Sequence, residues 1–366
     1  MRTLTITCTA TIFFIFSQTA QASIQAAKAG ADYLVNVQLV DGGWSWENGG
    51  TSAENITGAT GIGLIRYYDA IGGSGYLNAA KDAGDYIRNH TYTNGENRFS
   101  TFDPYFSWKL SLSAGDSTWS DHAATQFFDE LTAGTYGPNN YDTAGFVSAV
   151  QVGRTGTWVN LRPWEFSTIA LTARNIGNGG QADLFRQGIL DGLNTLDNTA
   201  PSNVYRDLIG VTGGVRGLAL DGLTTFTAIN SPLHAGINGI NTLSGLAGYL
   251  VNQQNTDGSW YRHSNLTSPG EDDKDTQTTA YAILALEAAA VAAGTNYDSQ
   301  IAVARNWLTT MQDGATGGFH SFPGDTDPLN NEVSGEATAA LVPEPISLML
   351  LSLGPIALLR RSHSKR

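Results

Sequence analysis

A repeated twelve-residue segment is the feature that most constrains how this chain can fold. Residues 33–44 read YLVNVQLVDGGW and residues 249–260 read YLVNQQNTDGSW, so eight of the twelve positions are identical. A third, weaker copy keeps a glutamine at Gln312 and ends on an aromatic residue, Phe319. Self-similarity of this kind indicates an architecture of stacked units, each packing against its neighbours.

Each copy has the pattern of a helix that stops at a turn. Apolar residues recur at helical spacing over 24–39 and 301–312 and form a stripe on one side, as in a helix that covers a core. Asp-Gly then ends the helix in the two stronger copies, and the aromatic residue folds back.

A second type of helix follows the turns. Residues 276–293 are apolar nearly all round, which is typical of a helix buried on most sides, and residues 57–71 and 164–176 are similar. We therefore expect an all-α domain in which amphipathic and buried helices alternate. Residues 91–120 are polar and aromatic, and they are predicted to form a long loop with at most one helix.

Two copies of the repeat also carry a recognisable motif. Gln38 precedes Trp44, and Gln254 precedes Trp260, with the same spacing and a glycine between the two residues. This pattern resembles the QW repeat of squalene cyclases and prenyltransferase-like proteins. The resemblance implies an (α/α)6 toroid, in which inner and outer helices surround a central cleft. It is strong over 24–70 and 245–341 and faint over 90–235.

The glutamine and tryptophan have a physical role in such a fold. The glutamine amide can satisfy backbone groups at a helix end, and the indole ring can stack on it. We therefore assign Gln38, Trp44, Gln254 and Trp260 to the scaffold. The last inner helix is expected to begin near Glu332 and to run straight into the C-terminal segment, which predicts imperfect closure of the ring.

The first 22 residues are predicted to be a secretory signal peptide. Arg2 supplies a positive start, an apolar run follows, and residues 20–22 form an Ala-x-Ala site with cleavage after Ala22. The only cysteine, Cys8, lies in this segment, so the predicted mature protein has no disulfide and no thiolate metal site.

The last 25 residues resemble a PEP-CTERM sorting signal. Pro343, Glu344 and Pro345 precede an apolar run over 346–359 and a basic end. The run is too short to span a bilayer core comfortably, so we expect only transient membrane anchoring. The resemblance implies cleavage by an exosortase and delivery to the cell surface, outer envelope or extracellular matrix of a Gram-negative bacterium.

These boundaries divide the chain into a signal peptide (1–22), a toroid (23–341) and a sorting segment (342–366). The full chain has 20 basic and 33 acidic residues. Without its two ends it keeps 15 basic and 32 acidic residues, a net charge of −17. A surface this acidic disfavours nucleic acid and anionic membranes as partners. The expected partners are the secretion machinery, the exosortase and an extracellular polysaccharide.

An acidic run before the helix at 276–293 is the main candidate for chemistry. It includes Asp273 and Asp275, which can cap the helix or face the cleft. Hopene-type cyclases have an Asp-x-Asp-Asp-Thr-Ala motif at a comparable place, but here the residue aligned with the protonating aspartate is Lys274. His263 and Glu336 are the other candidates, and catalysis requires that the four converge in an open cleft.

Other catalytic signatures are missing from the sequence. The histidines show no metal-binding spacing, the zinc set of prenyltransferases lacks its cysteine, and no Gly-x-Ser-x-Gly elbow occurs. No metal or cofactor is therefore expected. Two hypotheses remain: a structural or binding protein at the cell surface, or an extracellular polysaccharide lyase or hydrolase that uses cleft carboxylates.

Overall fold

The computed structural model describes residues 21–53, 55–90, 101–137, 139–153, 162–199, 206–266, 270 and 273–343. The signal segment up to residue 20 and the sorting segment from Glu344 onward, with the apolar run at 346–359, lie outside these residues. Ala22 lies in a helix over residues 21–37 and is exposed. Within the described part, no helix has the length and apolar character needed to cross a membrane.

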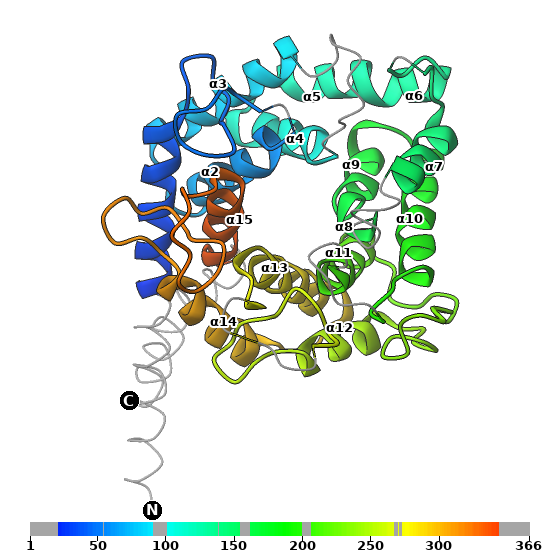
Figure 1. Cartoon of the computed structure of the whole chain (residues 1–366). Helices are drawn as coiled ribbons and strands as arrows, with labels where there is room; N and C mark the ends of the chain where they lie inside the picture. Colours follow the sequence, from blue (N-terminus) through cyan, green and yellow to red (C-terminus); the bar gives the residue numbers. More distant parts are fainter. Residues whose placement is uncertain are drawn as a thin grey trace, which may run out of the picture.

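The protein is an all-α toroid, as the sequence predicts (Figure 1). Among the described residues β-structure is limited to isolated bridges. The inner ring consists, in order, of α2 (Thr57–Ile71), α4 (Phe102–Ala114), α9 (Ile169–Ile176), α11 (Asp207–Leu220), α13 (Thr276–Ala293) and α15 (Asn331–Leu341). Each inner helix packs against the next, and α15 returns to α2.

The outer ring contains the amphipathic helices. It consists of the helix over 21–37, α3 (Ser74–His90), the run α5 (Thr118–Ala123), η1 (Ala124–Asp129) and α6 (Glu130–Ala133), then α10 (Gly179–Asn194), α12 (Leu243–Asn252) and α14 (Asp298–Thr310). Two further segments, α7 (Thr143–Gly153) and α8 (Arg162–Glu165), lie beside α10 and α11.

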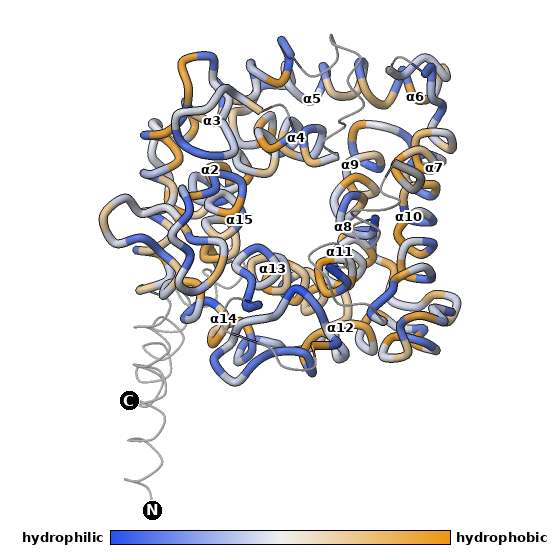
Figure 2. Tube along the Cα trace, in the orientation of Figure 1, coloured by the Kyte–Doolittle hydropathy of each residue, from blue (hydrophilic) through white to orange (hydrophobic). Residues whose placement is uncertain are grey.

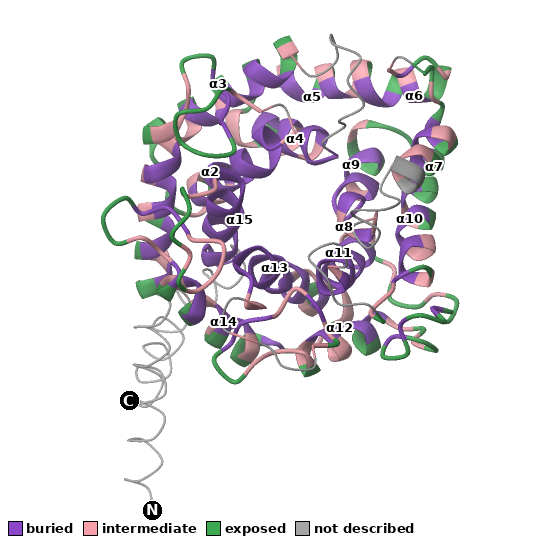
Figure 3. Ribbon diagram, viewed as in Figure 1, coloured by how far each residue is buried: buried purple, intermediate pink, exposed green. Residues whose placement is uncertain are grey.

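Burial follows this two-layer arrangement. Inner helices are buried along most of their length and exposed residues lie mainly on the periphery, in outer helices and loops (Figure 3). Apolar segments of the outer helices face the inner ring, and hydrophilic loops lie at the rim (Figure 2). Every residue of α15 is buried, because a helix of the inner ring has neighbours on several sides.

Two sequence predictions about the elements are wrong. The stretch 91–120 contains α4 and the start of α5 within its described residues, instead of a loop with at most one helix. The helix predicted over 164–176 is divided by a turn at 166–168 into α8 and α9. Both stretches lie within 90–235, where the resemblance to QW-repeat proteins is faint.

The repeat motif links neighbouring units around the ring. The side-chain amide of Gln38 donates to its own turn at Gly42 and to the carbonyl of Ala79 in the next outer helix, each at 2.8 Å. Gln254 does the same with Gly258 and Gln300, at 3.1 and 2.9 Å. Each glutamine therefore satisfies two carbonyls and fixes the register of two adjacent outer helices.

The tryptophans of the motif act through their ring nitrogens. The indole N–H of Trp44 donates to the carbonyl of Leu34 at 2.9 Å, and that of Trp260 donates to Leu250 at 2.8 Å. Both rings are fully buried. The bonds tie the folded-back residue to the helix that precedes its turn, whereas Phe319 in the third copy has no such donor.

The ring closes fully, so the prediction of imperfect closure is wrong. Gln312 of the third copy donates to Ala26 in the first outer helix at 2.9 Å and to Gly317 at 2.8 Å. Gly63 of α2 and Gly335 of α15 allow a close backbone approach, because a Cβ atom on Gly63 would lie 2.5 Å from the carbonyl oxygen of Gly335.

Replacing Gln312 with alanine is expected to lower the free energy of unfolding by about 1–3 kcal/mol, since two carbonyls lose their donor at the closure. The measurement is the urea midpoint of the full chain. The matched control is Gln187→Ala, whose exposed side chain donates to Asp191 one turn further along the same helix, and which should change stability by less than about 0.5 kcal/mol. Equal midpoints for the two variants would show that the bonds of Gln312 contribute nothing.

Candidate functional site

The N-terminal ends of the inner helices meet at one mouth of the ring. The backbone N–H of Gly58, in α2, donates to the carboxylate of Asp103, in α4, at 3.0 Å. Arg206, the residue before α11, donates to Gln277 of α13 at 3.3 Å. Gln277 in turn donates to Glu336 of α15 at 3.2 Å. Gly58, Asp103 and Gln277 lie in first turns and Glu336 lies in the second turn of α15, so these contacts join the same ends of neighbouring helices, which therefore run in parallel.

Buried acidic residues gather at this mouth. They are Asp103, Glu165, Asp207, Asp275 and Glu332, each no more than 6% exposed. Negative charge is favourable at the N-terminus of a helix because the backbone N–H groups there are unpaired. Burial of so many carboxylates at one end of the ring therefore has a structural reason, and a catalytic interpretation needs further evidence for each residue.

Asp275 is tied into the fold. Its side chain caps α13 by accepting from the N–H of Thr278 at 2.8 Å, and it pairs with Arg262 at 3.1 Å. Burial alone would raise the pKa of Asp275, but the positive charges of Arg262 and Arg206 and the bonds from Thr278 outweigh it, so the pKa lies below its usual value. Asp275 is an ionised cap.

The rest of the acidic run makes local contacts too. Asp273 is partly buried and accepts from the N–H of Gly270 at 2.8 Å. Lys274, which occupies the place of the cyclase acid, donates to Asp257 at 2.7 Å. Neither side chain has the environment of a strong acid.

Glu336 differs from the other carboxyl groups. It is 3% exposed, and its Oε1 accepts from the hydroxyl of Tyr281 at 2.5 Å, while Oε2 is buried with no hydrogen-bond partner. Burial and the nearby charge of Glu332 raise the pKa of Glu336 well above its usual value. Its environment therefore favours the neutral carboxylic acid over the carboxylate, and one of its oxygens has no hydrogen-bond partner.

Aromatic rings cross the inside of the ring beside this acid. The centroid of Trp164 lies 5.5 Å from that of Tyr281 and 4.9 Å from that of Phe102. Phe102 belongs to α4 and Tyr281 to α13, which lie on opposite sides of the inner ring. The ring nitrogen of Trp164 is also buried without a partner. The acid thus faces an aromatic interior.

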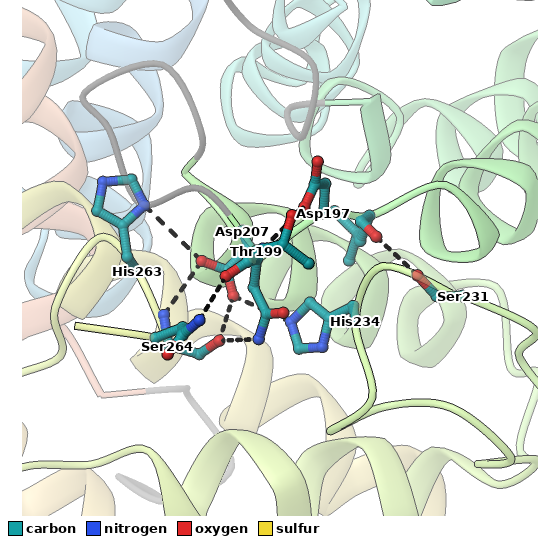
Figure 4. Close-up of polar contacts among 10 residues, drawn as sticks. Asp197, Thr199, Asp207, Ser231, His234, His263 and Ser264 are labelled. Carbon is teal, nitrogen blue, oxygen red and sulfur yellow. Dashed lines mark hydrogen bonds and ion pairs between the residues drawn. The ribbon is translucent and has the colours of Figure 1, made fainter. Parts of the chain in front are cut away.

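His263 belongs to a separate cluster around Asp207 (Figure 4). The Nδ1 atom of His263 lies 3.8 Å from Oδ1 of Asp207, and Nε2 of His234 lies 3.0 Å from Oδ2. Ser264 donates to the same carboxylate through its N–H at 3.1 Å and its hydroxyl at 2.6 Å. Burial lowers the pKa of His263, and Arg262 and Arg206 add to this effect while Asp207 opposes it.

This cluster is not arranged as a nucleophilic triad. In a triad the histidine stands between the serine and the aspartate, whereas here Asp207 stands between Ser264 and both histidines (Figure 4). The contacts hold two loops against the start of α11. Among the residues that the structure describes, no group of three His, Cys, Asp or Glu side chains is placed to hold a metal ion.

The four predicted site residues therefore lie at one mouth of the ring but do not form one cluster. Among the described residues, no hydrogen bond or ion pair joins two of them, although the charge of Asp275 acts on Glu336 and that of Asp273 acts on His263. Asp207, Glu332 and Arg216 were not predicted. A carboxylate at the first residue of a buried helix was a usable signal for Asp207, and the spacing of four residues from Glu336 was one for Glu332.

Comparison with protein-family models and with curated proteins finds no match. Solved structures are similar in fold. An α-1,6-mannanase from Salegentibacter superposes with a TM-score of 0.57 at 11% identity, covering 90% of this chain and 99% of that one. An unsaturated glucuronyl hydrolase from a Bacillus species gives 0.55 at 13% identity, with 88% and 96% covered.

A type II terpene cyclase from Scytonema is also similar, with a TM-score of 0.52 at 13% identity, covering 89% of this chain and 98% of that one. Identities this low establish a shared α/α toroid and nothing about activity. The chain is an α/α toroid protein whose buried acid, Glu336, stands in an aromatic interior.

Proposed function

We propose that the protein is an exported, glycan-active hydrolase in which Glu336 is the general acid. The observation that carries the proposal is the environment of Glu336, which raises its pKa well above the usual value and leaves Oε2 without a hydrogen-bond partner. Some of the similar structures are named as glycan hydrolases, a mannanase and a glucuronyl hydrolase, and others as a terpene cyclase, so the toroid is compatible with this chemistry.

Glu332 is the proposed partner of the acid. It lies one helical turn before Glu336 on α15 and is 6% exposed, and its negative charge is among the causes that keep Glu336 protonated. Two carboxyl groups with opposed protonation states are the usual machinery of glycoside hydrolysis. Glu336 gives its proton to the glycosidic oxygen as the carbon–oxygen bond breaks, and Glu332 takes a proton from the attacking water.

Tyr281 and Gln277 position the acid. Both donate to Oε1 of Glu336, at 2.5 and 3.2 Å, which leaves Oε2 to carry the proton. Trp164 and Phe102 supply aromatic faces of the kind that pack against sugar rings.

Export and sorting are part of the proposal. The support comes from the sequence, through the predicted signal peptide and the PEP-CTERM-like segment over 342–366. If an exosortase removes that segment, the secreted protein from a host with an exosortase should have the mass of a chain that starts at Ser23 and ends near residues 343–345. A mass that still includes residues 346–366 would contradict the sorting proposal.

The test of activity is an assay on polysaccharides of known composition. The full chain is incubated with mannans, glucans, polygalacturonate and alginate, and new reducing ends and unsaturated uronides are measured. Release of reducing ends that is lost in Glu336→Gln and kept in Glu47→Gln, an exposed carboxyl group, would support the proposal. No release from any of the substrates would contradict it.

A second candidate is a structural or binding protein without catalysis. The observation in its favour is that Asp207, Asp273 and Asp275 all have structural partners. Binding of a polysaccharide in affinity electrophoresis, with no product in the assay and no effect of Glu336→Gln, would favour this alternative.

A further inference from the structure

Arg216 is a buried cation inside the ring. It lies on α11 and is 5% exposed. Its guanidinium carbon lies 5.9 Å from the ring centroid of Tyr105, on α4. Since α9 stands between α11 and α4 in the inner ring, this contact crosses the inside of the ring. The cation therefore belongs to the same interior as the aromatic residues beside Glu336.

No carboxylate within the described ranges forms an ion pair with Arg216. Other arginines that are at least partly buried do have such partners: Arg66 and Arg305 with Glu287, Arg262 with Asp275, and Arg186 with Asp221. A buried charge is costly unless an opposite charge or a strong hydrogen-bond partner accompanies it. A contact with an aromatic face compensates only part of that cost.

The cation also acts on the residue that donates to the acid. The positive charge of Arg216 acts on Tyr281, whose hydroxyl donates to Glu336. The raised pKa of Glu336 favours its neutral form, which neither pairs with Arg216 nor repels a bound anion. The interior thus combines a cation, aromatic faces and a proton donor.

We propose that Arg216 binds the carboxylate of an acidic sugar, so that the ligand of the ring is a uronate-containing glycan. A guanidinium group binds a carboxylate through two parallel hydrogen bonds, which fixes the orientation of a sugar as well as its charge. Tyr105 and Trp164 offer aromatic faces to the sugar ring. This inference rests on the proposed function, because it names the substrate class of the same site.

The experiment measures binding without turnover. The full chain carrying Glu336→Gln is titrated by calorimetry with oligogalacturonate, with oligomannuronate and with a neutral mannooligosaccharide of equal length. We expect a uronate to bind at least about 10-fold more tightly than the neutral sugar. Adding Arg216→Gln should weaken uronate binding roughly 10- to 100-fold and leave neutral binding unchanged. Arg216→Lys should restore part of the affinity, since lysine keeps the positive charge but cannot form the two parallel hydrogen bonds of a guanidinium group.

Stability provides the folding control for these variants. Removing an uncompensated buried charge should leave the urea midpoint unchanged or raise it, so a folded Arg216→Gln protein is expected. If this variant is unfolded, uronate binding to the protein that carries only Glu336→Gln is measured at increasing salt concentrations. Binding that is insensitive to salt overturns the inference.

The outcomes separate the two proposals. Uronate binding that depends on Arg216, without cleavage by the unmutated chain, supports the anion site and contradicts the hydrolase. Cleavage of neutral glycans only, with no effect of Arg216→Gln, supports the hydrolase and overturns the anion site. Equal affinity for charged and neutral oligosaccharides also overturns it.

Discussion

Replacing Glu287 with alanine is expected to lower the free energy of unfolding by about 3–5 kcal/mol, the cost of leaving buried cations without their counter-charge. Glu287 lies on α13 and is 8% exposed. Its two carboxylate oxygens pair with Arg66 of α2, at 2.9 Å, and with Arg305 of α14. We refer to these three residues as the clamp.

The clamp holds the end of α15 against α2, α13 and α14. Arg66 donates to the carbonyl of Val342 at 3.0 Å, and Arg305 donates to the carbonyls of Ala340 and Val342 at 2.9 and 3.3 Å. Nearby, the hydroxyl of Ser23 donates to the carbonyl of Leu341. Without Glu287 the two guanidinium groups would repel each other where α15 ends, so the closure of the ring should weaken first.

Urea unfolding of the full chain measures this effect, with Lys28→Met as the control. The pair of Lys28 and Asp32 is also short, at 2.6 Å, but the two side chains are 57% and 44% exposed. Solvent screens such a pair, so its removal should hardly change the urea midpoint. If Glu287→Ala and Lys28→Met shift the midpoint equally, the clamp does not stabilise the closure.

A further variant separates charge from packing. Replacing Glu287, Arg66 and Arg305 together with apolar residues of similar size should recover much of the loss, because no uncompensated charge remains. A triple variant as unstable as Glu287→Ala would indicate that the hydrogen bonds to residues 340–342 matter more than the ion pairs.

Much of the fold could be predicted because its signals are local. The bounds of α2 and α13 agree with the sequence prediction, since each is an apolar run between a turn and a glycine that ends the helix. The bounds of α4 could not be predicted, and the sequence allowed only one helix in 91–120, because α4 shows no apolar stripe. Phe102 and Tyr105 contact residues across the ring, whereas Phe106 packs against Gly61 of α2.

The site was harder to predict because its contacts are long-range. Asp275 could be identified as a possible cap from the run that precedes α13, since a cap and its helix are adjacent in sequence. The partner of Glu336, Tyr281, lies 55 positions away. Arg216 and Tyr105 belong to helices separated by α9. Only the closed ring brings these side chains together.

Replacing Glu336 with glutamine is expected to lower the rate of glycan cleavage by about 10²- to 10⁴-fold, the usual contribution of a general acid. Glutamine has nearly the same shape, and its amide oxygen can still accept from Tyr281. The substitution removes only the transferable proton. A loss in kcat with little change in KM would show that substrate binding is intact.

The same variant should be more stable than the unmutated chain as the pH rises. The pKa of Glu336 is raised in the folded protein, by burial and then by the charge of Glu332. A carboxyl group with a raised pKa contributes to stability fully below the ordinary glutamate pKa of 4.5. That contribution is lost as the pH rises through the pKa of the group in the folded protein. Asp275, Tyr281 and Arg206 also face this carboxyl group, and they are unchanged in both proteins.

Urea midpoints from pH 4 to pH 9 compare the two proteins, and Glu47→Gln serves as the surface control. The difference between Glu336→Gln and the unmutated chain should grow in favour of the variant with increasing pH, while Glu47→Gln shows no such trend. A stabilised but inactive variant is the signature of an acid retained for chemistry at the expense of stability. Should Glu336→Gln instead lose stability at every pH, Glu336 is an ordinary buried hydrogen-bond acceptor, and the ring needs another proton donor.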